Sequence, residues 1–197
     1  METVESLMHV IRSRRTCYRF EDTAIAPVSE QMLQNCLEAA IWAPNHKLTE
    51  PWRFWTLSKL TQAQLAPLYA KLRADKRAEP DSEAHQSIYQ SAIEKFNKFP
   101  VVMFVGQQLA QEAITVKEDY AACACAIQNF QLMAWRQNMG VQWSTGPLIH
   151  ADEVYELLGV HPSEVELIGI LYIGQLKGDC STQNGRRKPV SEVSATV

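Results

Sequence analysis

The chain has 197 residues, of which 46% are hydrophobic and 21% are charged, a composition typical of an ordinary globular protein. Its formal net charge of -3 argues against a general nucleic-acid-binding protein. No apolar run is long enough to cross a bilayer and the N-terminus lacks a signal-peptide pattern, so we expect a cytoplasmic protein with no membrane partner.

Helical patterns dominate the first forty residues. Apolar residues recur at i, i+3, i+4 and i+7 from Val4 to Ile11, and this spacing predicts a helix that ends in the basic run RSRR (12–15). Ser29 is a suitable N-cap for a second helix, whose wide apolar stripe ends at Ile41.

The middle of the chain alternates between strand-like and helical patterns. RFWTLS (53–58) and VVMFVG (101–106) predict strands, because they are short, apolar and rich in aromatic or β-branched residues. A helical face covers 65–72, and Ser82 can cap a further helix. The polar segment 73–83 between them predicts an exposed, mobile connector.

The longest helical pattern covers residues 117–139 and is apolar on more than one face. Such a helix is buried centrally or between subunits, and Gly140 is placed to end it. The remaining expected elements are a strand at 141–146, a helix at 151–159 and a buried strand at 165–174. The order α, α, β, α, α, β, long α, β, α, β predicts an α+β fold. We expect residues 1–197 to form a single domain with a polar tail from about residue 177.

The motifs of several common catalytic classes are missing. The sequence contains no GxGxxG after a strand, no GxxxxGK[ST], no HExxH and no GxSxG, although a triad assembled from distant residues stays open. No histidines are paired at metal-ligand spacing, so we predict no metal site. The cysteines lack CxxC spacing, and we interpret Cys17, Cys36, Cys123 and Cys125 as packing residues.

Polar clusters do stand at the ends of the predicted elements. RRTCYRF (14–20) follows the first helix, and two arginines beside a hydroxyl can hold a phosphate, although basic residues also suit a helix C-terminus. APNHKLTEPWRF (43–54) connects a helix to a strand, WSTG (143–146) ends a strand, and GRRKP (185–189) lies in the tail. Each of these has a purely structural alternative.

Taken together, these clusters resemble the FMN-dependent nitroreductase family. RRTCYRF, APNHKLTEPWRF, KEDYAACACAIQ, NMGVQWSTGPL, VELIGILYIG and RRKPVSEV follow one another in the family's order, from about residue 5 to 193. The AP-x-H-K string resembles that of a compact subfamily. The resemblance implies a central, mostly antiparallel sheet flanked by helices, with the long helix at a homodimer interface.

The resemblance also implies a set of FMN-binding residues. Arg14, Arg15 and Thr16 match the motif that binds the phosphate and ribityl chain. Further matches are Trp143, Ser144 and Thr145 beside the flavin ring, Tyr18 near its N1/O2 edge, and Arg187, alone or with Arg186, near the phosphate.

The loop after the second helix is expected to contact the flavin of the other subunit. By resemblance, Trp42 and His46 touch FMN bound mainly by the partner. The structural alternatives are core packing for Trp42 and a loop-stabilising hydrogen bond for His46, whereas we expect Trp52 to be structural.

Three positions depart from the family pattern. Thr16 replaces a serine and keeps the hydroxyl, and Glu50 replaces a glutamine. Tyr18 stands where many relatives have a cation near the flavin, so the redox potential and the range of acceptors stay open.

The activity implied is a flavoenzyme without a catalytic residue of its own, because FMN carries the chemistry. NADH or NADPH would reduce FMN, and the electrons would pass by ping-pong transfer to a nitroaromatic, a quinone or a related small acceptor. The alternatives are a non-catalytic flavin sensor or carrier, a same-fold enzyme that cleaves flavin or removes halogens, and a helical interaction protein without cofactor.

Overall fold

The computed structural model describes residues 4–178, 185 and 187–197, and its elements follow the predicted order. The helices are α1 (Val4–Ser13), α2 (Glu30–Ile41), α3 (Lys59–Asp75), α4 (Glu83–Asn97), α5 (Ala113–Arg136) and α6 (Asp152–Leu158). The strands are β1 (Trp52–Thr56), β2 (Val101–Gln108), β3 (Met139–Ser144) and β4 (Val165–Gln175). The expected α+β class is confirmed.

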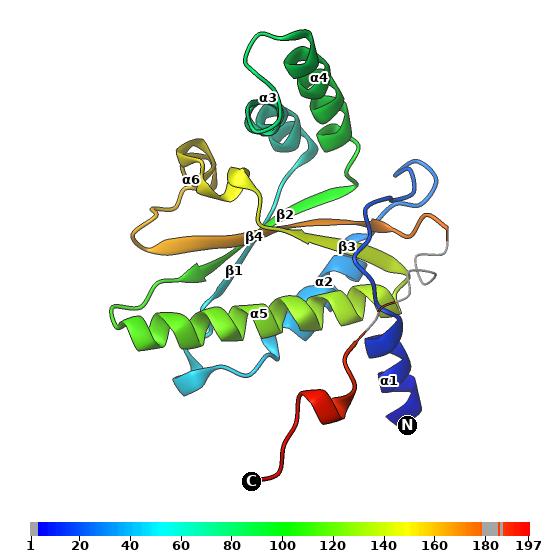
Figure 1. The fold of residues 1–197 in the computed structure, drawn as a ribbon, viewed down its shortest axis with the longest axis vertical. Helices are drawn as coiled ribbons and strands as arrows, with labels where there is room; N and C mark the ends of the chain where they lie inside the picture. Colours follow the sequence, from blue (N-terminus) through cyan, green and yellow to red (C-terminus); the bar gives the residue numbers. More distant parts are fainter. Residues whose placement is uncertain (1–3, 179–184, 186) are drawn as a thin grey trace.

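The four strands form one sheet in the order β1-β2-β4-β3, and every neighbouring pair is antiparallel (Figure 1). The two central strands are buried along most of their length, which explains why both appear in the sequence as continuous apolar runs. The register between them shifts by one residue on β4 at Val105/Gly106.

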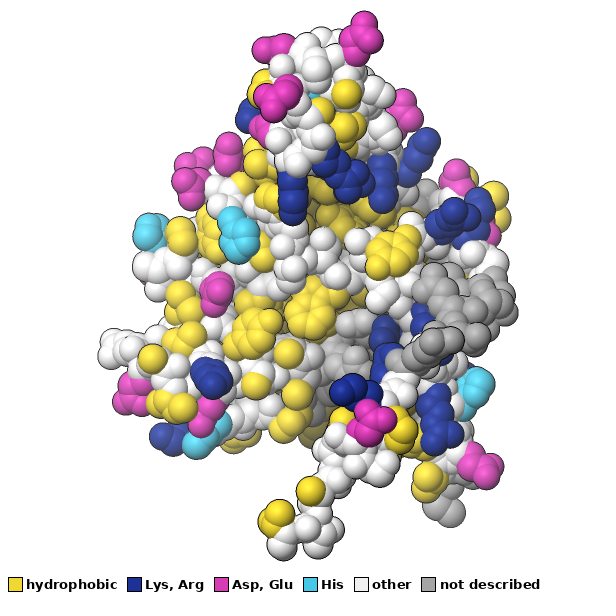
Figure 2. Space-filling model, viewed as in Figure 1, with side chains coloured by type: hydrophobic (Ala, Val, Ile, Leu, Met, Phe, Trp, Pro, Cys, Tyr) yellow, Lys and Arg dark blue, Asp and Glu magenta, His cyan; other side chains and the backbone are white. Residues whose placement is uncertain are grey.

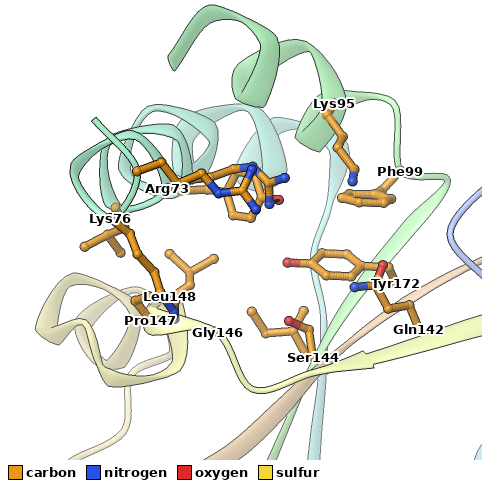
Figure 3. A pocket seen from close by; sticks show the side chains of 14 residues that line it. Arg73, Lys76, Lys95, Phe99, Gln142, Ser144, Gly146, Pro147, Leu148 and Tyr172 are labelled. Carbon is orange, nitrogen blue, oxygen red and sulfur yellow. Dashed lines mark hydrogen bonds between the residues drawn. The ribbon is translucent and has the colours of Figure 1, made fainter. Parts of the chain in front are cut away.

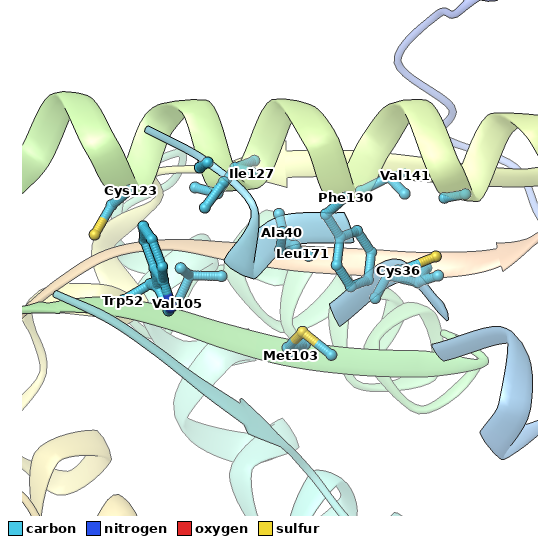
Figure 4. Packing of buried hydrophobic residues seen from close by; sticks show 14 of the residues in the cluster. Cys36, Ala40, Trp52, Met103, Val105, Cys123, Ile127, Phe130, Val141 and Leu171 are labelled. Carbon is cyan, nitrogen blue, oxygen red and sulfur yellow. The ribbon is translucent and has the colours of Figure 1, made fainter. Parts of the chain in front are cut away.

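Helices cover both faces of this sheet (Figure 1). On one face, α5 and α2 enclose a core in which Phe130 and Ile127 pack towards Met103 and Trp52 (Figure 4). The opposite face carries α3, α4 and α6 over a second core, with Phe96 among its fully buried side chains. Trp52 is only 7% exposed, so its expected structural role is confirmed. Among the described residues, no helix is both long and apolar enough to cross a membrane.

The predicted N-caps of two helices are confirmed. The Ser29 hydroxyl accepts a hydrogen bond of 3.2 Å from the amide of Met32, and Ser82 accepts one of 3.1 Å from the amide of His85. Each cap satisfies one of the amide groups that a helix N-terminus leaves without an intrahelical partner.

The end of the long helix differs from the prediction. We expected residues 117–139 with Gly140 as terminator, but α5 runs from Ala113 to Arg136, and Gly140 lies inside β3. The left-handed residue after the helix is Asn138, with φ of 60°. A close contact explains the glycine at position 140, because a Cβ there would lie 2.5 Å from the Cβ of Cys17.

The predicted connector 73–83 is also partly wrong. α3 begins at Lys59, tolerates Pro67 in its interior and continues to Asp75, so the non-helical link before α4 is shorter than expected. The Asp75 carboxylate forms a 2.8 Å ion pair with Lys71 within α3 and a 2.8 Å hydrogen bond with His85, and the second contact joins the end of α3 to α4.

The cysteines follow the packing prediction with one exception. Cys17, Cys36 and Cys123 are buried, and burial raises the pKa of the Cys36 and Cys123 thiols to about 12. These thiols therefore stay protonated and behave as small apolar groups. Cys125 is exposed on α5, so the packing role predicted for it is wrong.

We predict that Gly140→Ala destabilises the protein by about 1–3 kcal/mol, the usual cost of overpacking a close contact. The new methyl would press on Cys17, whose amide donates a 3.2 Å hydrogen bond to the Val141 carbonyl. Urea unfolding measures the change. Gly146→Ala is the control, because a Cβ at Gly146 meets no atom closer than 3.6 Å. Equal stability of both variants would contradict the proposed contact.

Candidate functional site

Three arginines gather beside the edge strand β3, and we call Arg14, Arg15 and Arg187 the arginine cluster. The segment after α1 runs along this strand, because Thr16 forms a parallel bridge with Val141. The C-terminal segment returns to the same place: a Cβ on Gly185 would lie 2.9 Å from the Arg15 guanidinium carbon. The fold therefore unites two basic motifs that are about 170 residues apart in the sequence.

The Arg14 side chain is half-buried and only partly satisfied. Its Nη1 donates a 3.2 Å hydrogen bond to Oε1 of Gln131 on α5, but its buried Nε has no hydrogen-bond partner among the described residues. Burial lowers the pKa of Arg14, and the nearby charges of Arg15 and Arg187 lower it further. An anion placed here would offset the repulsion and accept the free N–H.

Arg15 is fixed by the backbone of its own segment. Its Nη1 donates hydrogen bonds to the carbonyl oxygens of Arg12, at 2.6 Å, and Arg14, at 2.8 Å. Of the two C-terminal arginines in the predicted site, Arg187 belongs to the cluster through its effect on Arg14, whereas Arg186 lies outside the described residues.

The predicted ring contacts lie at the end of β3 and on the turn that follows it. Trp143 donates a 3.3 Å hydrogen bond from Nε1 to the carbonyl of Ile168 and packs towards the α5 side of the sheet. Gly169 makes room for this indole, since a Cβ there would lie 2.0 Å from Nε1. Ser144 faces the α3–α4 side, and Thr145 is exposed on the turn. The three residues therefore share a location but not a direction.

Tyr18 projects from the segment that leaves the arginine cluster. It is 57% exposed and lines a hollow of about 280 Å³ together with Lys95, Lys98 and Phe99. Two lysines thus stand close to the position where the sequence lacks the cation of many relatives.

The loop that follows α2 lies against the N-terminal half of α5. His46 Nδ1 is 3.2 Å from the Glu118 carboxylate, and the Thr49 hydroxyl donates a 2.7 Å hydrogen bond to Asp119. The structural alternative for His46 is therefore present in the single chain. Trp42 is 80% exposed, which excludes core packing within this chain.

Within one chain, His46 cannot share a ligand's phosphate region with the arginine cluster. Arg14 contacts α5 at Gln131, whereas His46 contacts it at Glu118, thirteen residues earlier. At 1.5 Å per residue, these contacts are about 20 Å apart along the helix. This separation applies to His46 and not to Trp42, which lines a hollow further along α5.

Sequence reasoning missed a basic pocket of about 310 Å³ between the sheet and the α3–α4 pair (Figure 3). Its cations are Arg73, Lys76, Arg77 and Lys95, and Ser144 lies on its wall. The first three have i, i+3, i+4 spacing, and Lys76 and Arg77 directly follow the last residue of α3, so the spacing indicates one side of this helix end once α3 is known to extend so far.

The model of the family described as "Nitroreductase family" matches residues 11–175. YfhC of Bacillus subtilis, whose name carries a provisional NAD(P)H nitroreductase assignment, is 32% identical over 160 residues, covering 80% of this chain and 78% of YfhC.

Two solved structures extend the comparison. A nitroreductase-like family protein from Bacillus cereus has a TM-score of 0.81 and 28% identity, covering 100% of this chain and 98% of its own. The FMN-dependent nitroreductase NfnB from Mycobacterium smegmatis, in complex with NADPH, has a TM-score of 0.71 and 17% identity, covering 98% of each chain. The nitroreductase-like fold implied by the sequence is confirmed.

Proposed function

Because the chain belongs to the nitroreductase family, we propose that it is an FMN-dependent oxidoreductase that uses NADH or NADPH to reduce a small acceptor. The observation that carries the proposal is the arginine cluster, with its mutual repulsion and the free Nε of Arg14. NfnB, with the same fold, binds NADPH and is FMN-dependent, which agrees with this assignment.

The cluster fits a phosphate monoester in charge and in donors. Guanidinium groups present planar forks of N–H donors that match phosphate oxygens. Arg14 and Arg187 would bind the phosphate directly, Arg15 would add positive charge from its fixed position, and the Thr16 hydroxyl would contact the ribityl chain. Riboflavin, which lacks the charged phosphate, would lose most of this attraction.

The flavin ring would lie beside the end of β3. Ser144 and Thr145 would offer hydroxyl and backbone groups to its polar edge, and Tyr18 lines the neighbouring hollow together with Lys95. When bound, FMN supplies the hydride and electron chemistry, and the protein binds, orients and shields it. If reductant and acceptor use the same position in turn, the kinetics are ping-pong.

We also propose that the protein works as a homodimer. Large apolar side chains are exposed on α1, at the end of α2 and on α5, including Leu7, Ile41, Trp42 and Tyr120. Trp42 lines a hollow of about 360 Å³ with Leu7 and with Met133 of α5. A second copy would cover this surface and would bring its own Trp42 and His46 to the flavin.

Two alternatives keep the same cofactor. A flavin sensor or carrier would bind FMN without rapid reduction, and a related enzyme could use reduced flavin for flavin cleavage or dehalogenation. The acceptor, the preference between NADH and NADPH, and the cytoplasmic location stay predictions.

One experiment tests the proposal. We expect the purified protein, after incubation with FMN and removal of the excess, to release FMN on heating, and its flavin absorption to bleach under anaerobic NADH or NADPH. Release of FAD, or no retained flavin, would contradict the cofactor. FMN that both nicotinamides leave oxidised would favour the sensor.

A further inference from the structure

The basic pocket has an uneven distribution of charge. Of its fourteen lining residues, Arg73, Lys76, Arg77 and Lys95 are cationic, and none is acidic. Among the described residues, no ion pair within 4 Å involves any of these four. Figure 2 shows basic side chains gathered below the α3–α4 pair, above a hydrophobic part of the surface.

These charges are held close together by α4 and by the end of α3 with the turn that follows it. Arg73 is half-buried, and its Nη1 lies 3.4 Å from the Tyr69 hydroxyl. Partial burial lowers the pKa of Lys95, and the charges of Arg73 and Arg77 add to the effect. Four cations of a chain with a net charge of -3 thus repel one another around one cavity. An anion would relieve this repulsion.

Part of the pocket lining is apolar. Phe99 and Tyr172 stack with ring centroids 4.1 Å apart and an interplanar angle of 19°. Leu148 and Ile170 complete the apolar part, and Figure 3 shows Arg73 and Lys95 directed towards these rings. A cavity of about 310 Å³ is at the small end of ligand sites, so it suits one substituted ring and not a whole dinucleotide.

The pocket adjoins the candidate flavin site. Ser144 and Gly146, on either side of Thr145, line it, and Lys95 lines both this pocket and the hollow beside Tyr18. A ring bound here would therefore lie next to the proposed flavin.

We propose that this pocket binds the electron acceptor and selects aromatic acceptors that carry a carboxylate. This inference rests on the proposed function for the electron transfer, but not for the binding of the anion. Arg73 and Lys95 would hold the carboxylate, while the apolar lining residues would contact the ring. In the reaction, a nitro group takes up two electrons and two protons and is reduced to a nitroso group with release of water, and NAD(P)H supplies the electrons.

The test compares an anion with its neutral counterpart. We expect the FMN-loaded protein to bind benzoate at least about tenfold more tightly than benzamide by calorimetry, and to lose this difference in Arg73→Gln/Lys95→Met, since hydrogen bonds to charged groups are the strong ones. The ratio of kcat/KM for 4-nitrobenzoate over 4-nitrobenzamide should fall by about the same factor. Lys71→Met, on the same helix but outside the pocket, should keep both preferences.

Three results would overturn the inference. The first is equal binding of benzoate and benzamide by the unaltered protein. The second is competition between benzoate and FMN for the flavin-free protein, which would make the pocket part of the flavin site. The third is a variant whose only loss is in KM for NADPH relative to NADH, which would assign the cations to the reductant. Reduction of a neutral quinone reports separately on the proposed function, because it needs no anion site.

Discussion

Arg14→Gln and Arg187→Gln should each weaken FMN binding by about 1.5–3 kcal/mol, and riboflavin binding much less. A loss of about 1.5–3 kcal/mol is the usual contribution of a hydrogen bond to a charged group, and it corresponds to roughly 10- to 150-fold in Kd. Riboflavin lacks the phosphate, so the difference between the two ligands isolates the phosphate contact. Titration calorimetry on the flavin-free variants measures both affinities.

Arg14→Gln should not destabilise the flavin-free protein. The pKa of Arg14 is lower in the folded chain than its ordinary value, because burial and two neighbouring cations disfavour its charged form. The charge therefore costs folding free energy at every pH below that lowered pKa, which includes neutral pH. We expect urea unfolding of flavin-free Arg14→Gln to give a stability equal to or above that of the unaltered chain.

Arg12→Gln is the matched control, because Arg12 is exposed on the last turn of α1 and contributes only its backbone carbonyl to Arg15. It should leave both flavin affinities within about twofold. Equal losses for FMN and riboflavin in the Arg14 and Arg187 variants would show that these arginines do not bind the phosphate.

The order of elements was predictable because each has a local cause. The stripe of α2, the serine caps and the apolar runs of β2 and β4 are all determined by residues close in sequence. Asn138 and Gly140 were misassigned because the demand on Gly140 comes from Cys17, more than a hundred residues away. The helical continuation to Asp75 was hidden by its polar composition, which an ion pair within α3 and one contact with α4 stabilise.

Part of the candidate site was also predictable from the sequence and part was not. Arg14 and Arg15 could be proposed from an adjacent pair, and the resemblance extended this to Arg187. The basic pocket could not be predicted, because its cations come from the end of α3, the turn after it and α4, whose packing brings Arg73 and Lys95 together. The contact of His46 with Glu118 was likewise invisible, since nothing local to the loop specifies its partner on α5.

If the site is built from two chains, mixing two inactive variants should restore part of the activity. Arg14→Gln/Arg15→Gln removes the phosphate contacts, and Trp42→Ala/His46→Ala removes the groups expected from the other subunit. In a heterodimer of the two variants, the intact arginines of one chain meet the intact loop of the other at one of the two sites. The second site carries both defects. The contacts of Arg14 and His46 on α5 are about 20 Å apart within one chain, which is why we propose that His46 reaches the site from the second chain.

The control is a heterodimer of the arginine variant with a chain that carries all four changes, which contains no intact site in any arrangement. Each chain carries its own affinity tag, so that two successive purifications isolate the heterodimer from both homodimers. Circular dichroism of each homodimer checks that loss of activity is not loss of fold.

The decisive measurement is the NAD(P)H-dependent reduction of a quinone by the purified heterodimer loaded with FMN. We expect about half of the unaltered dimer's activity, because one of two symmetric sites is complete, against little activity in either homodimer and in the control. Activity no higher than that of the homodimers would place Trp42 and His46 outside the partner's site. A monomer at micromolar concentration that keeps FMN and full activity would contradict the two-chain site altogether.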